Sequence, residues 1–332
     1  MARSPFWLRR IVCVALFTGV LLGAVFALSG CGGAKDDGWP KDHPGPKIVV
    51  SFAPIYCFAA NVAGDDAVVR NLLTSSGPHN FQPTDRDARL LHRADLFFVN
   101  GIGLEGDKPK NMKDGSGNAK LKIVELGSRV PDDRLYEGSC HHEGEEHHEE
   151  HEHGKDPHIW LSPDYAIVEV EAIRDELKAA DPAHAANYET RAAAYIAKLR
   201  KLKEDGIAML KDKKDRRIVT FHDSMTYFAK TFDISIIGVV QKNPGTEPND
   251  KQLKTLIALC TDPPVRVICV EPQYSNSNSA AELVKELKRH KVPDPALVEL
   301  DPLETVASGQ LTPDWYETKM RANLKALAEK LQ

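Results

Sequence analysis

Seven of the thirteen histidines in this 332-residue chain lie in one stretch, SCHHEGEEHHEEHEHGKDPHIWLSP, between Ser139 and Pro163. Neutral imidazole is the commonest metal ligand in proteins, and the glutamates among these histidines could also bind metal. The clustering is too dense for chance and predicts metal binding. Composition alone does not say which of the histidines belong to a folded site.

Other candidate ligands come directly after, or just beyond, short apolar segments. His222 follows RIVTF, Glu271 follows VICV, and Asp301 follows ALVEL. His79 lies just beyond VVRNLLT, and His158 lies in the loop before a predicted helix. In open parallel sheets, ligands bind outside the carboxyl ends of the strands. The side chains at these strand ends are therefore expected to share one location, which His158 joins from its loop.

The elements that must position these residues alternate from Lys47 onward. Longer helical patterns separate the β-branched runs KIVVSF, AVVRNLL, DLFFVN and LKIVEL, and then RIVTF, ISIIGV, VRVICV and ALVEL. This alternation is typical of α/β folds with mostly parallel sheets, and two sets of four runs predict two similar lobes. Between the sets, Ser162 and Pro163 are expected to begin a helix, and Asp181-Pro182 precedes a second helix of about thirty residues.

The N-terminal residues are predicted to be an export signal outside the fold. Arginines precede the apolar run IVCVALFTGVLLGAVFALSG, although a run of this length could also form a permanent anchor helix. The sequence LSGC, which ends at Cys31, resembles the bacterial lipobox. That resemblance implies removal of residues 1–30, acylation of Cys31 and an extracytoplasmic location on a membrane. Residues 31–46, rich in Gly, Pro and charge, are expected to form a flexible tether.

The remaining chain is expected to divide into two lobes and a linker. The predicted boundaries are 47–180 for the N-terminal lobe, with a His-rich loop at 131–156, then 181–215 for the linking backbone helix and 216–332 for the C-terminal lobe. A net charge of −5 with scattered basic residues gives no reason to expect nucleic acid as a partner. Export would permit disulfides, and a Cys260–Cys269 bridge stays open.

Five groups of motifs, in order, resemble one family of transport proteins. They are GPHNFQPTDRDARLLHRADLFFVNGIGLEG, DPHIWLSP, FHDSMTYFAKTF, NPGTEPNDKQLKTLI, and EPQYSNSNSAAELVKEL with ELDPLETV. They resemble the metal-binding solute-binding lipoproteins of ABC importers, cluster A-I, in its zinc branch, and the similarity runs from Lys47 almost to the C-terminus. The resemblance implies a monomeric, non-enzymatic receptor that binds Zn²⁺ between two lobes and delivers it to an ABC permease and its ATPase.

The same resemblance implies a set of ligands. His79, His158 and His222 match the family's three histidines, and Asp301 or water matches a variable fourth position. Three imidazoles favour zinc, whereas manganese prefers carboxylates, although a receptor for manganese or another divalent metal is the alternative. Because ligating imidazoles usually donate their second N–H to an oxygen, Asp223 is a candidate acceptor.

The histidines that precede His158 are assigned a separate role. The acidic loop that holds them is expected to be flexible and to collect metal weakly. These auxiliary ligands are His141, His142, His147, His148, His151 and His153.

Two other functions fit part of this pattern. A zinc ion with three nitrogen ligands and one water resembles a catalytic centre, so a zinc-dependent hydrolase is the enzyme alternative. The chain contains no H-E-x-x-H motif, and Glu271 is the glutamate nearest to a ligand motif. A metal buffer or adhesin without a permease is the third possibility, and the residues separate it poorly from a receptor.

Overall fold

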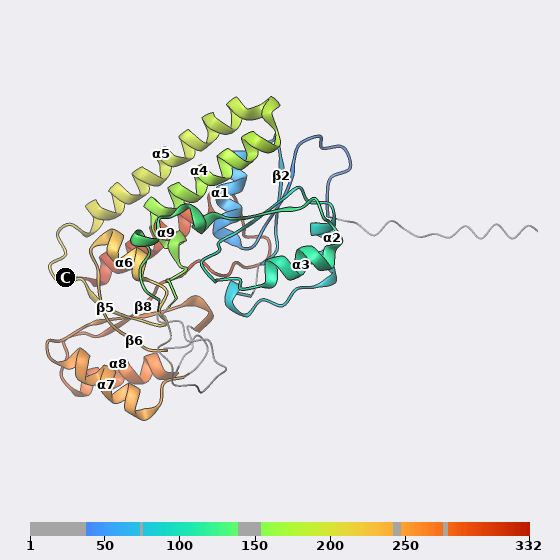
Figure 1. Cartoon of the computed structure of the whole chain (residues 1–332). Coiled ribbons are helices and arrows are strands. Elements are labelled where there is room, and N and C mark those ends of the chain that lie inside the picture. The colour runs from blue at the N-terminus through green and yellow to red at the C-terminus, as the bar shows by residue number, and fades with distance from the viewer. Residues whose placement is uncertain (1–37, 74–75, 139–153, 242–246, 275–277) are drawn as a thin grey trace, which may run out of the picture. The chain divides into compact units, whose positions relative to one another are not determined.

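The computed structural model describes residues 38–73, 76–138, 154–241, 247–274 and 278–332 (Figure 1). Cys31 and the six auxiliary histidines lie outside the described residues. The chain from Asp37 to Gln332 forms one compact unit. None of the described helices is both long and apolar enough to cross a membrane.

The first sheet is parallel, with the strand order β2-β1-β3-β4. Its strands are β1 (Lys47–Val50), β2 (Val68–Asn71), β3 (Leu96–Val99) and β4 (Lys122–Glu125). The helices between them are α1 (Ala53–Ala63), α2 (Asp85–His92) and α3 (Lys108–Ser116). All four residues of β3 are buried, as expected for an apolar run in a central parallel strand covered on both faces.

The second sheet repeats this arrangement, with the parallel order β6-β5-β7-β8. Its strands are β5 (Arg217–Thr220), β6 (Ser235–Val239), β7 (Val267–Val270) and β8 (Ala296–Glu299). The helices that follow them are α6 (Thr226–Phe232), α7 (Asp250–Thr261), α8 (Asn278–Arg289) and α9 (Trp315–Lys330). The prediction of two similar α/β lobes, with a strand at each of the eight runs, is confirmed.

Two helices connect the sheets. Helix α4 (Pro163–Ala180) begins after Ser162, with proline in its first turn as predicted, and α5 (Ala185–Leu210) is the long linking helix. Helix α5 contacts α1, which follows β1 of the first sheet, and also α6 and α9, which follow strands of the second sheet. Helix α5 has 26 residues and ends at Leu210, so it is somewhat shorter than the expected thirty.

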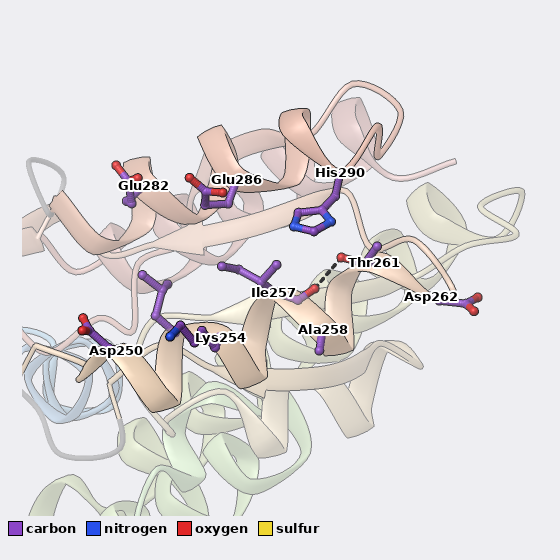
Figure 2. A pocket seen from close by; sticks show the side chains of 10 residues that line it. Asp250, Lys254, Ile257, Ala258, Thr261, Asp262, Glu282, Glu286 and His290 are labelled. Atoms are coloured by element: carbon purple, nitrogen blue, oxygen red, sulfur yellow. Dashed lines mark hydrogen bonds between the residues drawn. The ribbon is translucent and has the colours of Figure 1, made fainter.

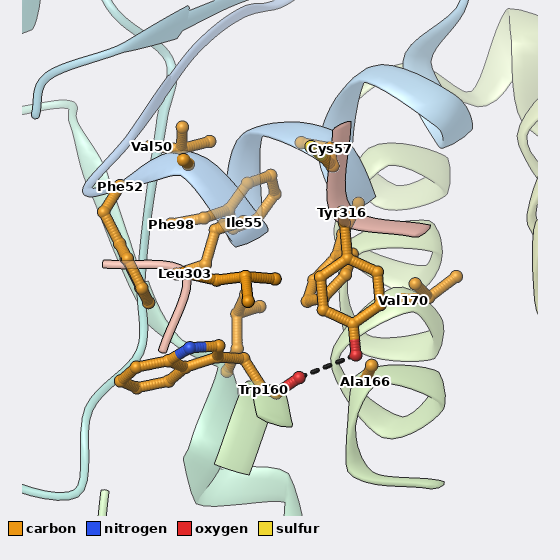
Figure 3. Close-up of a cluster of buried hydrophobic side chains, with 14 of the residues drawn as sticks. Val50, Phe52, Ile55, Cys57, Phe98, Trp160, Ala166, Val170, Leu303 and Tyr316 are labelled. Carbon is orange, nitrogen blue, oxygen red and sulfur yellow. Dashed lines mark hydrogen bonds between the residues drawn. The ribbon is translucent and has the colours of Figure 1, made fainter. Parts of the chain in front are cut away.

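One hydrophobic core includes side chains from both sheets. Val49 and Phe98 of the first sheet belong to the same buried cluster as Val267 and Val298 of the second. Leu303, which follows β8, also belongs to it, and Figure 3 shows this side chain among aromatic rings from the first half of the chain. Cys260 and Cys269 are both buried free thiols, so the open question of a bridge between them is answered in the negative.

Candidate metal centre

Four side chains from distant parts of the chain converge outside the strand ends. His79 lies in a short 3-10 turn beyond β2, His158 precedes α4, His222 follows β5, and Glu304 follows β8. One potential ligand atom from each lies within 4.8 Å of the others. The structure thus brings together the three predicted histidines, and it adds a glutamate that the sequence analysis did not select.

The spacing of these atoms fits a tetrahedral metal shell. Glu304 Oε1 lies 3.3 Å from His79 Nε2, 3.6 Å from His158 Nε2 and 3.4 Å from His222 Nε2. The Nε2 atoms of His79 and His158 are 3.2 Å apart. Zinc binds nitrogen and oxygen at about 2.0–2.2 Å, so the edges of its tetrahedron measure about 3.3–3.5 Å. Four of the six separations among these ligand atoms therefore lie close to the edges of a zinc tetrahedron, and all six are within 4.8 Å.

Burial gives a second indication that the group suits a cation. His158, His222 and Glu304 are nearly or fully inaccessible to solvent, and His79 is partly exposed. His222 Nε2 and Glu304 Oε1 are buried without a hydrogen bond. Leaving such atoms unpaired normally costs about 1–3 kcal/mol each. A cation at their centre would satisfy both, so the residues present fit a metal ion.

Two further carboxylates orient the imidazoles. His158 Nδ1 donates to Asp156 Oδ1 at 2.7 Å, and the same oxygen accepts the backbone N–H of His158 at 2.9 Å. His222 Nδ1 donates to Glu271. These bonds place Nε2 as the free nitrogen on each ring, which is the usual outer-shell arrangement of a metal-binding histidine. Asp223 was a candidate acceptor; for His158 and His222 the acceptors are Asp156 and Glu271.

The same carboxylates control the charge of the metal-free site. Burial alone would lower the pKa of His158, but Asp156 and Glu304 outweigh it and raise that pKa to about 9. Burial likewise opposes protonation of His222, and Glu271 with Glu304 raises its pKa to about 10. Burial would raise the pKa of Glu304, but the surrounding histidines hold it well below its ordinary range. Without metal, His158 and His222 are therefore protonated at neutral pH and offset part of the negative charge of these carboxylates.

Asp301, the predicted fourth ligand, does not join this group. Its carboxylate forms an ion pair with Lys319 at 2.9 Å and accepts the backbone N–H of Leu303 at 2.8 Å. Asn323 bonds both the N–H and the C=O of Asp301. Asp301 thus fixes the turn after β8, and the carboxylate that reaches the histidines belongs to Glu304.

The turn between Asp301 and Glu304 is held by the hydrophobic core. Leu303 has φ of 63°, a left-handed conformation that costs a non-glycine residue about 1–2 kcal/mol. Its side chain is fully buried beside Phe52 and Trp160 (Figure 3). The Trp160 indole donates to the Pro302 carbonyl at 2.9 Å. These contacts offset the strain and direct Glu304 toward the histidines.

A second concave feature lies elsewhere in the second lobe. A groove of about 670 Å³ runs between α7 and α8, where Lys254 and Ile257 face Glu286 and His290 (Figure 2). It is open to solvent, and none of its lining residues belongs to the histidine cluster. Its acidic rim has no orienting carboxylates or converging imidazoles comparable to those of the candidate centre.

Comparisons with known proteins are consistent with this geometry. The chain is 32% identical to zinc-binding protein AdcA of Streptococcus pyogenes over 291 residues, 85% of this chain and 55% of that protein. It is 27% identical to manganese-binding lipoprotein MntA of Halalkalibacterium halodurans over 265 residues, 79% of this chain and 82% of that protein. The crystal structure of Zn(II)-bound AdcA from Streptococcus pneumoniae superimposes with a TM-score of 0.68 at 28% identity, over 86% of this chain and 58% of that chain.

A family model also matches most of the chain. This chain spans about half the length of the first curated relatives it matches, so their full activity does not transfer by length alone. The model for ZnuA, described as zinc-uptake complex component A, periplasmic, matches residues 48–330. That range includes both sheets, the linking helix and all four converging side chains. The chain therefore belongs to the ZnuA family.

Proposed function

We propose that this chain is an extracytoplasmic receptor that binds zinc through His79, His158, His222 and Glu304 and delivers it to an ABC permease driven by its ATPase. The observation that carries the proposal is the convergence of four ligand atoms within 4.8 Å of one another, with Glu304 Oε1 3.3–3.6 Å from the Nε2 atom of each histidine. Membership in the ZnuA family supports the same function.

The four-ligand shell argues against an enzyme. A catalytic zinc keeps one position open for water or substrate, whereas a closed shell of four protein ligands is used to hold the ion. Glu304 fills the position that the hydrolase alternative would reserve for water. The glutamate beside the site, Glu271, bonds His222 and is not positioned as a free general base.

The ligand types favour zinc over manganese. Three imidazoles and one carboxylate suit zinc, while manganese is better served by sites rich in carboxylate and water oxygens. A manganese receptor is the second candidate because MntA is among the relatives. Calorimetry of metal-free protein decides between them: we expect tight one-to-one binding of Zn²⁺ and much weaker binding of Mn²⁺. Equal affinities, or tighter binding of Mn²⁺, would contradict the zinc assignment.

A lipid anchor on Cys31 is part of the proposal. The sequence LSGC after the apolar run supports it, and lipoproteins occur among the relatives. We expect the mature protein to begin at Cys31 and to carry acyl chains. Intact-mass measurement of membrane-extracted protein tests this, and a chain that retains residues 1–30 would disprove it.

The auxiliary histidines are proposed to collect zinc for the main site. Each binding event in a flexible loop must order free chain, at about 1–2 kcal/mol per residue, so these sites should be weaker than the preorganised one. We expect full-length protein to bind more than one zinc ion, and a variant without residues 140–153 to keep one tight site. A zinc titration of both proteins against a competing chelator measures this. Loss of the tightest site, or unchanged stoichiometry, would contradict the division of roles.

A further inference from the structure

Tyr227 connects two parts of the chain that each carry a proposed ligand. It lies in the first turn of α6, shortly after His222, and its side chain is fully buried. The hydroxyl donates to the backbone carbonyl of Asp156 at 2.9 Å and accepts the backbone N–H of Tyr136 at 3.2 Å. Tyr136 and Asp156 belong to the first half of the chain, on either side of residues 139–153.

The hydroxyl takes the place of a main-chain hydrogen bond. Residues 136–138 and 154–156, called the neck, run antiparallel around a single bridge between Glu137 and Lys155, and the Asp156 N–H donates to the Tyr136 carbonyl at 2.8 Å. In an antiparallel ladder, two residues in a hydrogen-bonded pair, here Tyr136 and Asp156, normally exchange two backbone hydrogen bonds. Here the second bond runs through Tyr227, because its hydroxyl accepts the Tyr136 N–H and donates to the Asp156 carbonyl. The Tyr227 hydroxyl therefore bridges the two segments of the neck.

Ring packing holds the phenol in this position. The Tyr227 ring lies 5.0 Å from the rings of both Tyr136 and Tyr165, centroid to centroid. These rings belong to a small hydrophobic cluster with Val130 and Ile159. Among the described members of that cluster, Tyr227 is the one that comes from beyond α5. Its insertion fixes α6, and with it the segment that carries His222, against the segment that carries His158.

We propose that Tyr227 is a positioning residue for the metal centre. The path runs from its hydroxyl to the Asp156 backbone, and from the Asp156 carboxylate to the backbone and ring of His158. Tyr227 thereby sets the position of His158 relative to His222, and this restraint slows the release of the ion from the site. The inference rests on the proposed function, because it concerns how tightly the same site retains its ion.

The test is zinc release into excess chelator, followed by stopped flow. Tyr227→Phe keeps the ring packing but leaves the Tyr136 N–H and the Asp156 carbonyl without this partner, and we expect release about tenfold faster than wild type. Tyr165→Phe is the matched control, because its hydroxyl donates to the Arg134 carbonyl at 2.7 Å in the same cluster. We expect this control to release zinc at the wild-type rate.

Repeating the experiment in Asp156→Asn protein separates a positioning role of Tyr227 from a general loss of stability. If Tyr227 acts through Asp156, the tenfold effect should shrink to about threefold or less in Asp156→Asn protein, since the link to His158 is already weakened. Wild-type release by Tyr227→Phe would overturn the inference, and so would an undiminished effect in the Asp156→Asn background. Failure of wild-type protein to bind zinc would instead overturn the proposed function itself.

Discussion

Replacement of Glu304 by glutamine is expected to weaken zinc binding by about a hundredfold. Zinc sites of this kind give roughly 10–16 kcal/mol of apparent binding, which is about 3 kcal/mol for each of four ligands. The glutamine keeps the size of the side chain and removes its charge, and Glu304 Oε1 is the atom that approaches all three histidines. Calorimetry with a competing chelator, at one pH and ionic strength, measures the loss.

Asp301→Asn is the matched comparison for this prediction. The asparagine keeps an oxygen for the Leu303 N–H and loses only the ion pair with Lys319, so we expect a few-fold change in affinity at most. If Asp301→Asn weakens zinc binding as much as Glu304→Gln does, the assignment of the fourth ligand is wrong. Unchanged affinity in Glu304→Gln would remove Glu304 from the shell.

The convergence of side chains at the strand ends could be predicted because strand ends are visible in sequence, whereas the choice of His79, His158 and His222 as ligands came from the family resemblance. Glu271 follows β7 directly and His222 lies two residues after β5, and the parallel order of the second sheet brings the ends of β5 and β7 side by side. Ligands bind outside the carboxyl ends of parallel strands, so this location could be predicted without knowing the conformation of the loops. The alternation of strands and helices was equally readable, since each β-branched run is short and bounded.

The fourth side chain could not be selected in the same way. Asp301 stands where the rule points, at the end of β8, but its carboxylate is occupied by Lys319 and by its own turn. The residue that reaches the site depends on the left-handed turn at Leu303, which is stabilised by core contacts from the first half of the chain. No local pattern encodes those contacts. The one available signal was a further carboxylate in ELDPLETV, Glu304, three residues after Asp301.

The stabilisation of the protein by zinc is expected to increase from pH 6 to pH 9. In metal-free protein, His158 and His222 have pKa values of about 9 and about 10, against about 6.5 for an unfolded histidine. Groups with raised folded pKa values stabilise the fold fully below about pH 6.5, and this contribution is lost as pH rises through 9 and 10. The melting temperature of metal-free protein should therefore fall over this range.

Zinc binding has the opposite pH dependence, because both imidazoles must lose their protons before they can bind the ion. At a zinc concentration about a thousandfold above Kd, binding adds about 4 kcal/mol, or roughly 10 °C in melting temperature. The gap between zinc-loaded and chelator-treated protein should widen with pH, as measured by calorimetric melting at fixed ionic strength. Glu271→Gln, which removes one cause of the high pKa of His222, should make the metal-free decline shallower. A gap that narrows with pH would show that protons do not compete with zinc at these histidines.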